Sequence, residues 1–147
     1  MAATGKIGPL TELNRIIREG RVGDYQSPNL ALGMRPVKFE PGSSHWEWPE
    51  QPAAALNPFG SIHGGYLAVF VDELLSTAIG SILEADEWAM TAEMKLSYLH
   101  VLHAGPLEGS ARVLRRARQI AFVEAVVRQP GQDAAVMASS TWAISRV

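Results

Sequence analysis

Apolar residues between positions 66 and 83 are so frequent that they surround most of a helix instead of marking one face of it. The stretch has no helix breaker except Gly80. Its apolar positions are Leu67, Ala68, Val69, Phe70, Val71, Leu74, Leu75, Ala78, Ile79, Ile82 and Leu83. A helix that is apolar nearly all round is buried inside its domain. The pattern therefore predicts one long central helix that the rest of the chain covers.

The polar residues of this helix fall into two groups. One group follows helical spacing and forms a stripe that we expect to meet solvent: Glu73, Thr77, Gly80 and Glu84. The other group, Asp72 and Ser76, lies about 100° around the helix among apolar neighbours. Burial raises the pKa of a carboxyl group, and Ser76 lies one turn from Asp72, within hydrogen-bonding reach. Asp72 is therefore a candidate base or nucleophile, the alternative being a core carboxylate satisfied by its neighbours.

Period-two alternation predicts four strands after this helix, at residues 90–99, 107–115, 120–128 and 134–145. Their short connections favour antiparallel pairing, because parallel strands need long crossovers. Residues 30–48 predict a strand pair around a turn at 41–44, with Trp46 and Trp48 on one face. An antiparallel sheet wrapped around one helix is the simplest cover for that helix, which gives an α+β fold.

Helical spacing at residues 10–20 predicts a short amphipathic helix before these elements. Thr11 is its expected N-cap, and Gly20 follows its end. We read residues 1–28 as this helix and a lead-in to the domain. Residues 1–147 are then expected to form a single domain, which the length of the chain also favours.

Composition excludes several classes of protein. The 13 Lys and Arg residues against 15 Asp and Glu give a net charge of -2, so no positive field attracts nucleic acid. The chain has no cysteine, which removes thiol nucleophiles and thiolate metal sites. Residues 1–8 lack the apolar stretch of a secretory signal, and no segment has the length of a membrane span. We expect a cytoplasmic protein with no nucleic-acid or membrane partner.

Two consecutive glycines, Gly64 and Gly65, open the central helix. The first amides of a helix have no intrahelical partner, and the helix dipole favours negative charge at this end. These N–H groups are therefore candidate donors to a ligand oxygen that gains charge. The alternative is that the two glycines only make a tight turn.

The residues around this turn form a longer motif. It reads Asn57-x2-Gly60-x2-His63-Gly64-Gly65, and Asp72 stands nine residues after His63. The motif resembles the signature of the hotdog-fold acyl-CoA thioesterases, in particular the phenylacetate-degradation type and the related 4-hydroxybenzoyl-CoA thioesterases. Residues 91–99 and 105–107 are similar to later strands of the same family. The resemblance covers roughly residues 55–147 and implies the hotdog fold, an antiparallel sheet around one long helix.

The resemblance also implies roles for individual residues. The Gly64 amide would polarise the thioester carbonyl, and Asp72 would act either as nucleophile or as general base. Asn57 would orient water or the carboxylate, His63 would hold the turn by hydrogen bonding, and Thr91 would help to place water. Gly65 and Ser76 are placed with the substrate-binding residues. No metal or cofactor takes part in this hydrolysis.

Active sites of this family are shared between subunits. The resemblance therefore implies a homodimer in which Asp72 and Thr91 of one subunit face Gly64 and Asn57 of the other. We expect two such dimers to associate into a homotetramer.

An arginine cluster at residues 112–118 stands out in a chain that is acidic overall. Its members are Arg112, Arg115, Arg116 and Arg118. Coenzyme A carries a diphosphate and a 3′-phosphate, which arginine forks match well. Arg116 and Arg118, at the turn between two strands, are the favoured contacts to these phosphates. The alternative is a solvated hairpin.

The sequence leaves the roles of two further groups of side chains undecided. Trp46, Trp48, Phe59 and Trp88 either line an acyl pocket or, more in keeping with aromatics generally, fill the core. His100 and His103 have the spacing of a metal pair, but no Asp, Glu or Cys nearby completes a ligand shell, so no metal is expected. His100-Val101 also stands where relatives often carry Arg-Pro.

The predicted function is hydrolysis of an acyl-CoA to a carboxylic acid and free CoA. One alternative is a non-catalytic acyl-CoA binding module, which the presence of both Asp72 and the Gly64-Gly65 turn disfavours. Another is a hotdog-fold hydratase or dehydratase, whose His and Asp or Glu residues have other spacings. Aromatic, short-chain and medium-chain acyl groups all remain open.

Overall fold

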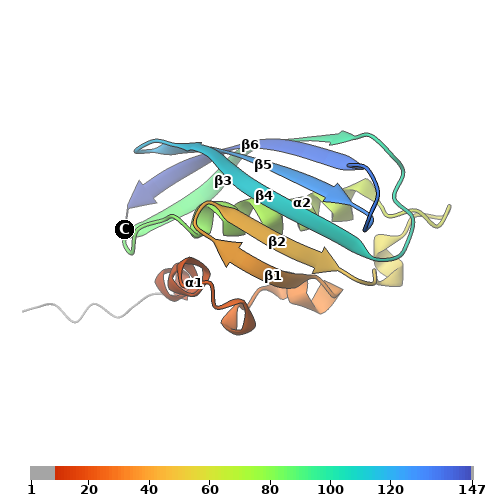
Figure 1. The fold of residues 1–147 in the computed structure, drawn as a ribbon, viewed down its shortest axis with the longest axis horizontal. Helices are drawn as coiled ribbons and strands as arrows, with labels where there is room; N and C mark the ends of the chain where they lie inside the picture. The colour runs from red at the N-terminus through yellow and green to blue at the C-terminus, as the bar shows by residue number, and fades with distance from the viewer. Residues whose placement is uncertain (1–8, 147) are drawn as a thin grey trace, which may run out of the picture.

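A six-stranded antiparallel sheet curves around one long helix in the computed structural model, which describes residues 9–146 (Figure 1). The elements are α1 (Pro9–Arg18), β1 (Arg35–Glu40), β2 (Ser43–Trp48), α2 (Gly64–Gly80), β3 (Glu87–Tyr98), β4 (Leu107–Arg116), β5 (Ile120–Arg128) and β6 (Val136–Arg146). Short 3₁₀ helices lie at Val22–Asp24, Pro28–Leu32 and Ala53–Ala55. The strand order is β1-β2-β4-β5-β6-β3. The predicted hotdog arrangement is confirmed, and part of the lead-in predicted for residues 1–28 lies outside the described residues.

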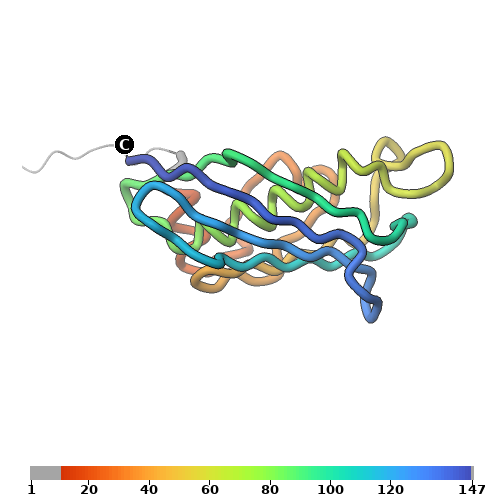
Figure 2. The backbone as a smooth tube through the Cα atoms, turned by 90° about the horizontal axis from the view of Figure 1, so that it is seen from above, coloured from red at the N-terminus to blue at the C-terminus, as the bar shows by residue number. Residues whose placement is uncertain are grey.

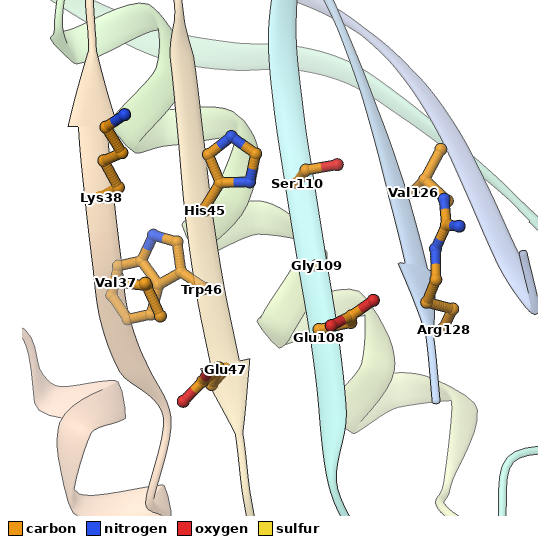
Figure 3. A pocket seen from close by; sticks show the side chains of 10 residues that line it. All are labelled: Val37, Lys38, His45, Trp46, Glu47, Glu108, Gly109, Ser110, Val126 and Arg128. Carbon is orange, nitrogen blue, oxygen red and sulfur yellow. The ribbon is translucent and has the colours of Figure 1, made fainter. Parts of the chain in front are cut away.

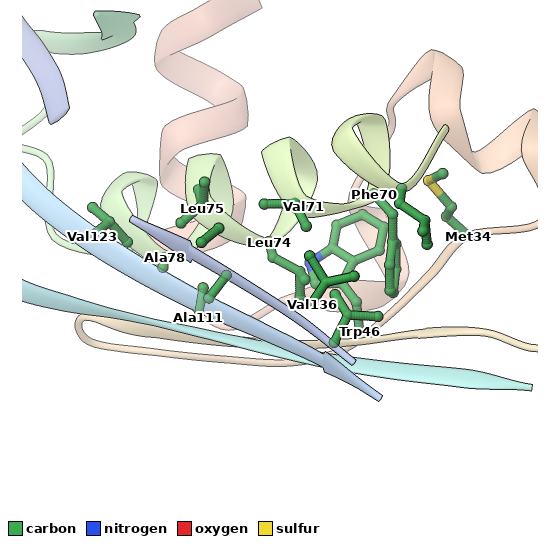
Figure 4. Close-up of a cluster of buried hydrophobic side chains, with 14 of the residues drawn as sticks. Met34, Trp46, Phe70, Val71, Leu74, Leu75, Ala78, Ala111, Val123 and Val136 are labelled. Atoms are coloured by element: carbon green, nitrogen blue, oxygen red, sulfur yellow. The ribbon is translucent and has the colours of Figure 1, made fainter. Parts of the chain in front are cut away.

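The core forms where α2 lies against the concave face of the sheet. Side chains from α2 interlock with side chains from the strands in one cluster, which includes Phe70, Leu74, Ala78, Ala111 and Val123 (Figure 4). A Cβ atom on Gly109 of β4 would come within 2.5 Å of Leu74 Cδ1. The absence of a side chain at Gly109 therefore makes room for Leu74 of α2 against β4. The prediction of a buried central helix is confirmed.

The N-terminal elements differ from the predictions in two places. Thr11 is the third residue of α1, because the helix begins at Pro9, so the N-cap prediction was wrong. Residues 30–32, predicted as strand, lie in the 3₁₀ helix Pro28–Leu32. The Ser27 side chain caps this helix by accepting a hydrogen bond of 3.2 Å from the Asn29 N–H. Proline after a capping serine favours a helical turn over an extended chain.

β3 is an edge strand of the sheet, and its outer edge pairs with no other strand of residues 9–146 (Figure 2). It is 12 residues long, and its central residues are exposed. Met90 is 54% exposed, and Tyr98, at the end of the strand, is 52% exposed. Long edges with exposed apolar side chains are typical of surfaces that pair with another chain.

No helix of residues 9–146 is long and apolar enough to cross a membrane.

Candidate active site

The N-terminus of α2 presents one backbone donor without an internal partner. His63 caps the helix, and its Nδ1 atom accepts a hydrogen bond of 3.0 Å from the Gly65 N–H. The His63 carbonyl accepts bonds from the N–H groups of Tyr66 and Leu67. No hydrogen bond among residues 9–146 uses the Gly64 N–H. That amide is therefore the one available to a ligand oxygen at the positive end of the helix dipole.

Tyr98 fixes the position of this helix end. Its hydroxyl donates a hydrogen bond of 2.7 Å to the Gly64 carbonyl. A Cβ atom on Gly64 would come within 3.3 Å of the Tyr98 ring, so the glycine allows this close packing. A pocket of about 530 Å³ opens beside the two glycines, lined also by Ile62, Leu67 and Val101. Sequence reasoning missed Tyr98 as a member of this site, although it lies in the strand that resembles the family.

Asp72 lies farther along α2 and contacts β3. The Thr91 hydroxyl donates a hydrogen bond of 3.0 Å to Asp72 Oδ1. Burial raises the pKa of the Asp72 carboxyl, the Thr91 hydrogen bond lowers it, and the charge of Glu73 raises it, with a net pKa above the ordinary value. Thr91 stands where the register of β3 against β6 shifts by one residue. The carboxylate is thus held by a hydroxyl at an irregular point of the edge strand.

Two other candidate residues, Asn57 and Ser76, make side-chain hydrogen bonds only within their own segments. Asn57 Oδ1 accepts hydrogen bonds from the N–H groups of Phe59 (2.9 Å) and Ser61 (3.2 Å), and its amide donates to Ser61 Oγ. Asn57 thereby closes the loop that precedes α2. Ser76 Oγ donates to the Glu73 carbonyl at 3.1 Å, so the predicted hydrogen bond from Ser76 to Asp72 was wrong.

Asp72 lies eight positions after Gly64 on the same continuous helix. At 1.5 Å per residue this is about 12 Å along the axis. A thioester carbonyl that accepts from one and is attacked by the other needs both groups within about 3 Å of its atoms. Within one chain these are therefore two separate groups of residues, Gly64 with His63 and Tyr98, and Asp72 with Thr91, which we call the two half-sites.

Three members of the predicted solvent stripe, Glu73, Thr77 and Gly80, are buried, so the prediction was wrong for them; the fourth, Glu84, is exposed but follows the end of α2. Glu73 is only 7% exposed and Thr77 is fully buried. The Glu73 carboxylate accepts three hydrogen bonds, from Tyr25 Oη (2.8 Å), Ser27 Oγ (2.6 Å) and Asn29 Nδ2 (2.6 Å). The segment 22–32 covers this face of the helix and supplies all three donors. Asp72, on the neighbouring face, is the more exposed of the two carboxyl groups.

The arginine cluster divides into different environments. Arg116 forms an ion pair with Glu87, whose side chain is 1% exposed and is also bonded by Arg146. Arg112 pairs with Glu124 across β4 and β5. Arg118 is exposed at the turn between β4 and β5 and makes no ion pair with residues 9–146. Of the two favoured residues, Arg118 is thus exposed and Arg116 is half-buried and paired.

The structure also shows where the aromatic residues and histidines lie whose roles the sequence left undecided. Trp46 and Trp48 are buried in the core, Phe59 is 90% exposed, and Trp88 lines a small pocket beneath α1. His100 and His103 are exposed, and residues 9–146 contain no group of three side chains arranged to hold a metal ion. A pocket of about 460 Å³ lies over β1, β2, β4 and β5 and is lined by Lys38, His45 and Arg128 among others (Figure 3). Its lining includes no residue of the two half-sites.

Comparison with known proteins places the chain among thioesterases. A family model described as the thioesterase superfamily matches residues 59–136, which include Gly64, Asp72 and Thr91. None of the curated proteins matches the chain in sequence.

Several solved structures have a similar fold and align with most of the chain. A conserved protein from Pseudomonas aeruginosa is 29% identical, with a TM-score of 0.75 over 82% of this chain and 94% of that chain. A phenylacetic acid degradation-related protein from Ralstonia eutropha is 26% identical, with a TM-score of 0.77 over 89% and 98%. The PaaI protein of the Escherichia coli phenylacetic acid degradation operon is 19% identical, with a TM-score of 0.76 over 92% and 96%, and shows the fold alone.

Proposed function

The chain belongs to the thioesterase superfamily and is a thioester hydrolase, and we propose that it hydrolyses an acyl-CoA at a site shared between two copies. The observation that carries this proposal is the pair of half-sites on α2. Each holds what the other lacks: a free backbone donor at Gly64 and a carboxylate with a raised pKa at Asp72. Together they supply the two elements that acyl transfer needs.

In the proposed reaction the thioester carbonyl oxygen accepts a hydrogen bond from the Gly64 N–H. Negative charge grows on this oxygen as the carbonyl is attacked, and the N-terminus of α2 stabilises it. Asp72 either attacks the carbonyl carbon itself or takes a proton from an attacking water. The C–S bond then breaks and CoA leaves as its thiolate. Attack by water gives the free carboxylate directly, whereas attack by Asp72 gives an acyl–Asp72 anhydride, which water then hydrolyses to the free carboxylate and the Asp72 carboxylate. Thr91 holds Asp72 Oδ1 throughout.

A dimer through β3 would complete the site. Two β3 strands related by a two-fold axis pair in antiparallel fashion and continue the sheet. The α2 helices of the two copies then also run antiparallel, so the Gly64 end of one points toward the middle of the other. The unpaired edge of β3 and its exposed Met90, Tyr98 and neighbouring Leu99 support this interface. The proposal includes the association of two such dimers into a homotetramer.

CoA would leave along the pocket beside Gly64. Of the two arginines favoured from sequence, we propose only Arg118 as a contact to its phosphates, because the guanidinium of Arg116 is already bonded to Glu87. His63 and Asn57 would act by holding the helix end and its preceding loop, since both bond to backbone N–H groups there.

Thiol release from acetyl-, hexanoyl-, phenylacetyl- and dodecanoyl-CoA tests this function. Asp72→Asn should lower kcat by about 10²–10⁴-fold, the usual contribution of a positioned base. Asp133→Asn, the same change in an exposed loop, is the matched control and should leave kcat within about twofold. No thiol release by the wild type, or equal turnover in Asp72→Asn, would contradict the proposal. Acyl-CoA binding without turnover would favour a binding module.

A further inference from the structure

Glu73 is a buried carboxylate next to Asp72 that the proposed hydrolysis does not use. Its side chain accepts three hydrogen bonds, from Tyr25 Oη (2.8 Å), Ser27 Oγ (2.6 Å) and Asn29 Nδ2 (2.6 Å). Neither Asp72 nor Glu73 forms an ion pair with residues 9–146. A buried charge with no cation beside it costs stability. Packing alone therefore does not favour a carboxylate at this position.

Hydrogen bonds hold Glu73 by its backbone as well as by its side chain. Its carbonyl accepts a bond of 2.7 Å from the Thr77 hydroxyl, and the Trp46 indole N–H donates to the same hydroxyl at 3.0 Å. This turn of α2 is thus anchored to β2 through its backbone and to segment 22–32 through the Glu73 side chain. Asp72 belongs to the same turn. The contacts of Glu73 therefore also fix where the Asp72 carboxylate lies.

The donors to the Glu73 side chain lie in a well-packed segment. Tyr25 is 5% exposed, and its ring packs edge-on against Trp46 and Phe39 at centroid distances of 5.4 and 5.5 Å. Burial raises the pKa of Tyr25 and the charge of Glu73 raises it further, so this side chain remains a hydroxyl donor. Ser27 also caps the 3₁₀ helix that follows it. The negative charge of Glu73 is therefore held in one place beside α2.

The fixed charge of Glu73 acts on Asp72. Burial raises the pKa of the Asp72 carboxyl, the Thr91 hydrogen bond lowers it, and the charge of Glu73 raises it. A carboxylate whose pKa is raised toward the working pH is a more effective base. We propose that Glu73 is a positioning residue for the hydrolysis, which holds the turn of α2 that carries Asp72 and keeps a negative charge beside the reacting carboxylate. This inference rests on the proposed hydrolysis at Asp72 and adds segment 22–32 to the parts of the chain that control it.

Exchanging donor and acceptor between positions 29 and 73 tests the inference. Asn29→Asp replaces a donor by a carboxylate that repels Glu73, and should lower kcat at least about tenfold. KM should stay within about twofold, because neither residue lines the pocket beside Gly64. In the double variant with Glu73→Gln, the amide at position 73 donates to the carboxylate at position 29, so kcat should recover at least about fivefold. Gln132→Glu, which also replaces an amide by a carboxylate but in an exposed loop, is the matched control and should leave kcat within about twofold.

Wild-type kcat in Asn29→Asp, or a double variant as slow as the single one, would overturn the inference and leave the proposed hydrolysis intact.

A second measurement needs no substrate and no change in segment 22–32. The Asp72 carboxyl is titrated by NMR in protein labelled at its aspartate carboxyl carbons, and its signal is identified by its absence from Asp72→Asn. Glu73→Gln should move the titration midpoint of Asp72 to lower pH, and Glu50→Gln, the same change at an exposed position, should leave it in place. An unmoved midpoint in Glu73→Gln would also overturn the inference. Absence of any thiol release by the wild type is a failure of the proposed function, and the titration still tests whether Glu73 acts on Asp72.

Discussion

The Thr91 hydroxyl donates a hydrogen bond of 3.0 Å to Asp72 Oδ1 and so ties the edge strand β3 to the central helix. Among residues 9–146 the second carboxylate oxygen, Oδ2, accepts no hydrogen bond. Thr91 therefore fixes the orientation of the carboxylate and leaves one oxygen to react. Because Thr91 is on the edge strand β3, its contact with Asp72 also lies where a second copy would pair.

The pH dependence of turnover should follow this contact. Asp72 must be ionised to react, and burial raises its pKa above the ordinary value of about 4. The acidic limb of kcat/KM should therefore have its midpoint above that value. Thr91→Val removes a hydrogen bond that lowers the pKa, so the midpoint should move to higher pH. Glu73→Gln removes a charge that raises the pKa, so the midpoint should move to lower pH.

Initial rates of thiol release between pH 4 and 9 measure both midpoints. Movement of the two midpoints in the same direction would show that Thr91 and Glu73 do not act on Asp72 as described.

Asp72→Asn should stabilise the protein while it removes activity. The folded chain raises the pKa of Asp72, so the native state holds the proton more tightly than the unfolded state. Ionisation of Asp72 then costs stability, and this cost is present above the folded pKa. The neutral asparagine avoids it at pH 7, and the gain should vanish below about pH 4, where Asp72 is protonated in both states. Urea unfolding at both pH values checks this; a lower midpoint for the variant at pH 7 would refute it.

Tyr25→Phe should destabilise the fold by about 1–3 kcal/mol, because it leaves the buried Glu73 carboxylate with one donor fewer. Tyr66→Phe is the matched control, since the Tyr66 hydroxyl makes no hydrogen bond with residues 9–146. Urea unfolding of both variants gives the two values. We call Glu73 and its three donors, Tyr25, Ser27 and Asn29, the Glu73 cluster. Equal stability of Tyr25→Phe and wild type would mean that this cluster does not hold segment 22–32 in place.

The Glu73 cluster also shows where sequence reasoning reached its limit. The periodicities that define α2 and the strands after it are local, so those elements followed from the chain alone. Which polar stripe of α2 meets solvent depends on what packs against it. Tyr25 lies 48 residues before Glu73, and no local pattern indicates that contact. An inverted assignment of the two stripes resulted, although Asp72 was still selected, first from its place on the helix and then through the family motif.

The two half-sites illustrate the same limit. The spacing of His63, Gly64 and Asp72 is readable in the sequence, and so is the helix that contains the last two. The hydrogen bonds from Thr91 and Tyr98 arise because β3 runs alongside α2, which depends on the strand order of the whole sheet. Thr91 was placed by resemblance, and Tyr98 was not found.

Arg116 and Arg118 should respond differently to the same substitution. Arg116→Ala removes a partner of buried Glu87 and should cost roughly 1.5–3 kcal/mol of stability. Arg118→Ala should leave stability unchanged and raise KM for an acyl-CoA, but not for the matching N-acetylcysteamine thioester, which has no phosphates. Steady-state kinetics with both substrates separate the cases. An equal change in KM for the two substrates would remove Arg118 from CoA binding.

The shared site can be tested with two defective variants. Gly64→Pro removes the proposed oxyanion donor at the first position of α2, where proline is favoured. His63 already has the extended backbone that precedes proline, with φ -62° and ψ 130°. Gly64→Ala is the control, because it adds a Cβ atom beside Tyr98 and keeps the N–H. Gly64→Pro should lose most activity, and Gly64→Ala should keep more of it.

The most direct measurement is thiol release by a mixture of Asp72→Asn and Gly64→Pro chains, unfolded together and refolded at equal concentrations. Each mixed dimer contains one site with intact Asp72 from one chain and intact Gly64 from the other. Random pairing should therefore restore about a quarter of wild-type activity, although each variant alone is inactive. A mixture as inactive as the separate variants would contradict a site shared between two copies.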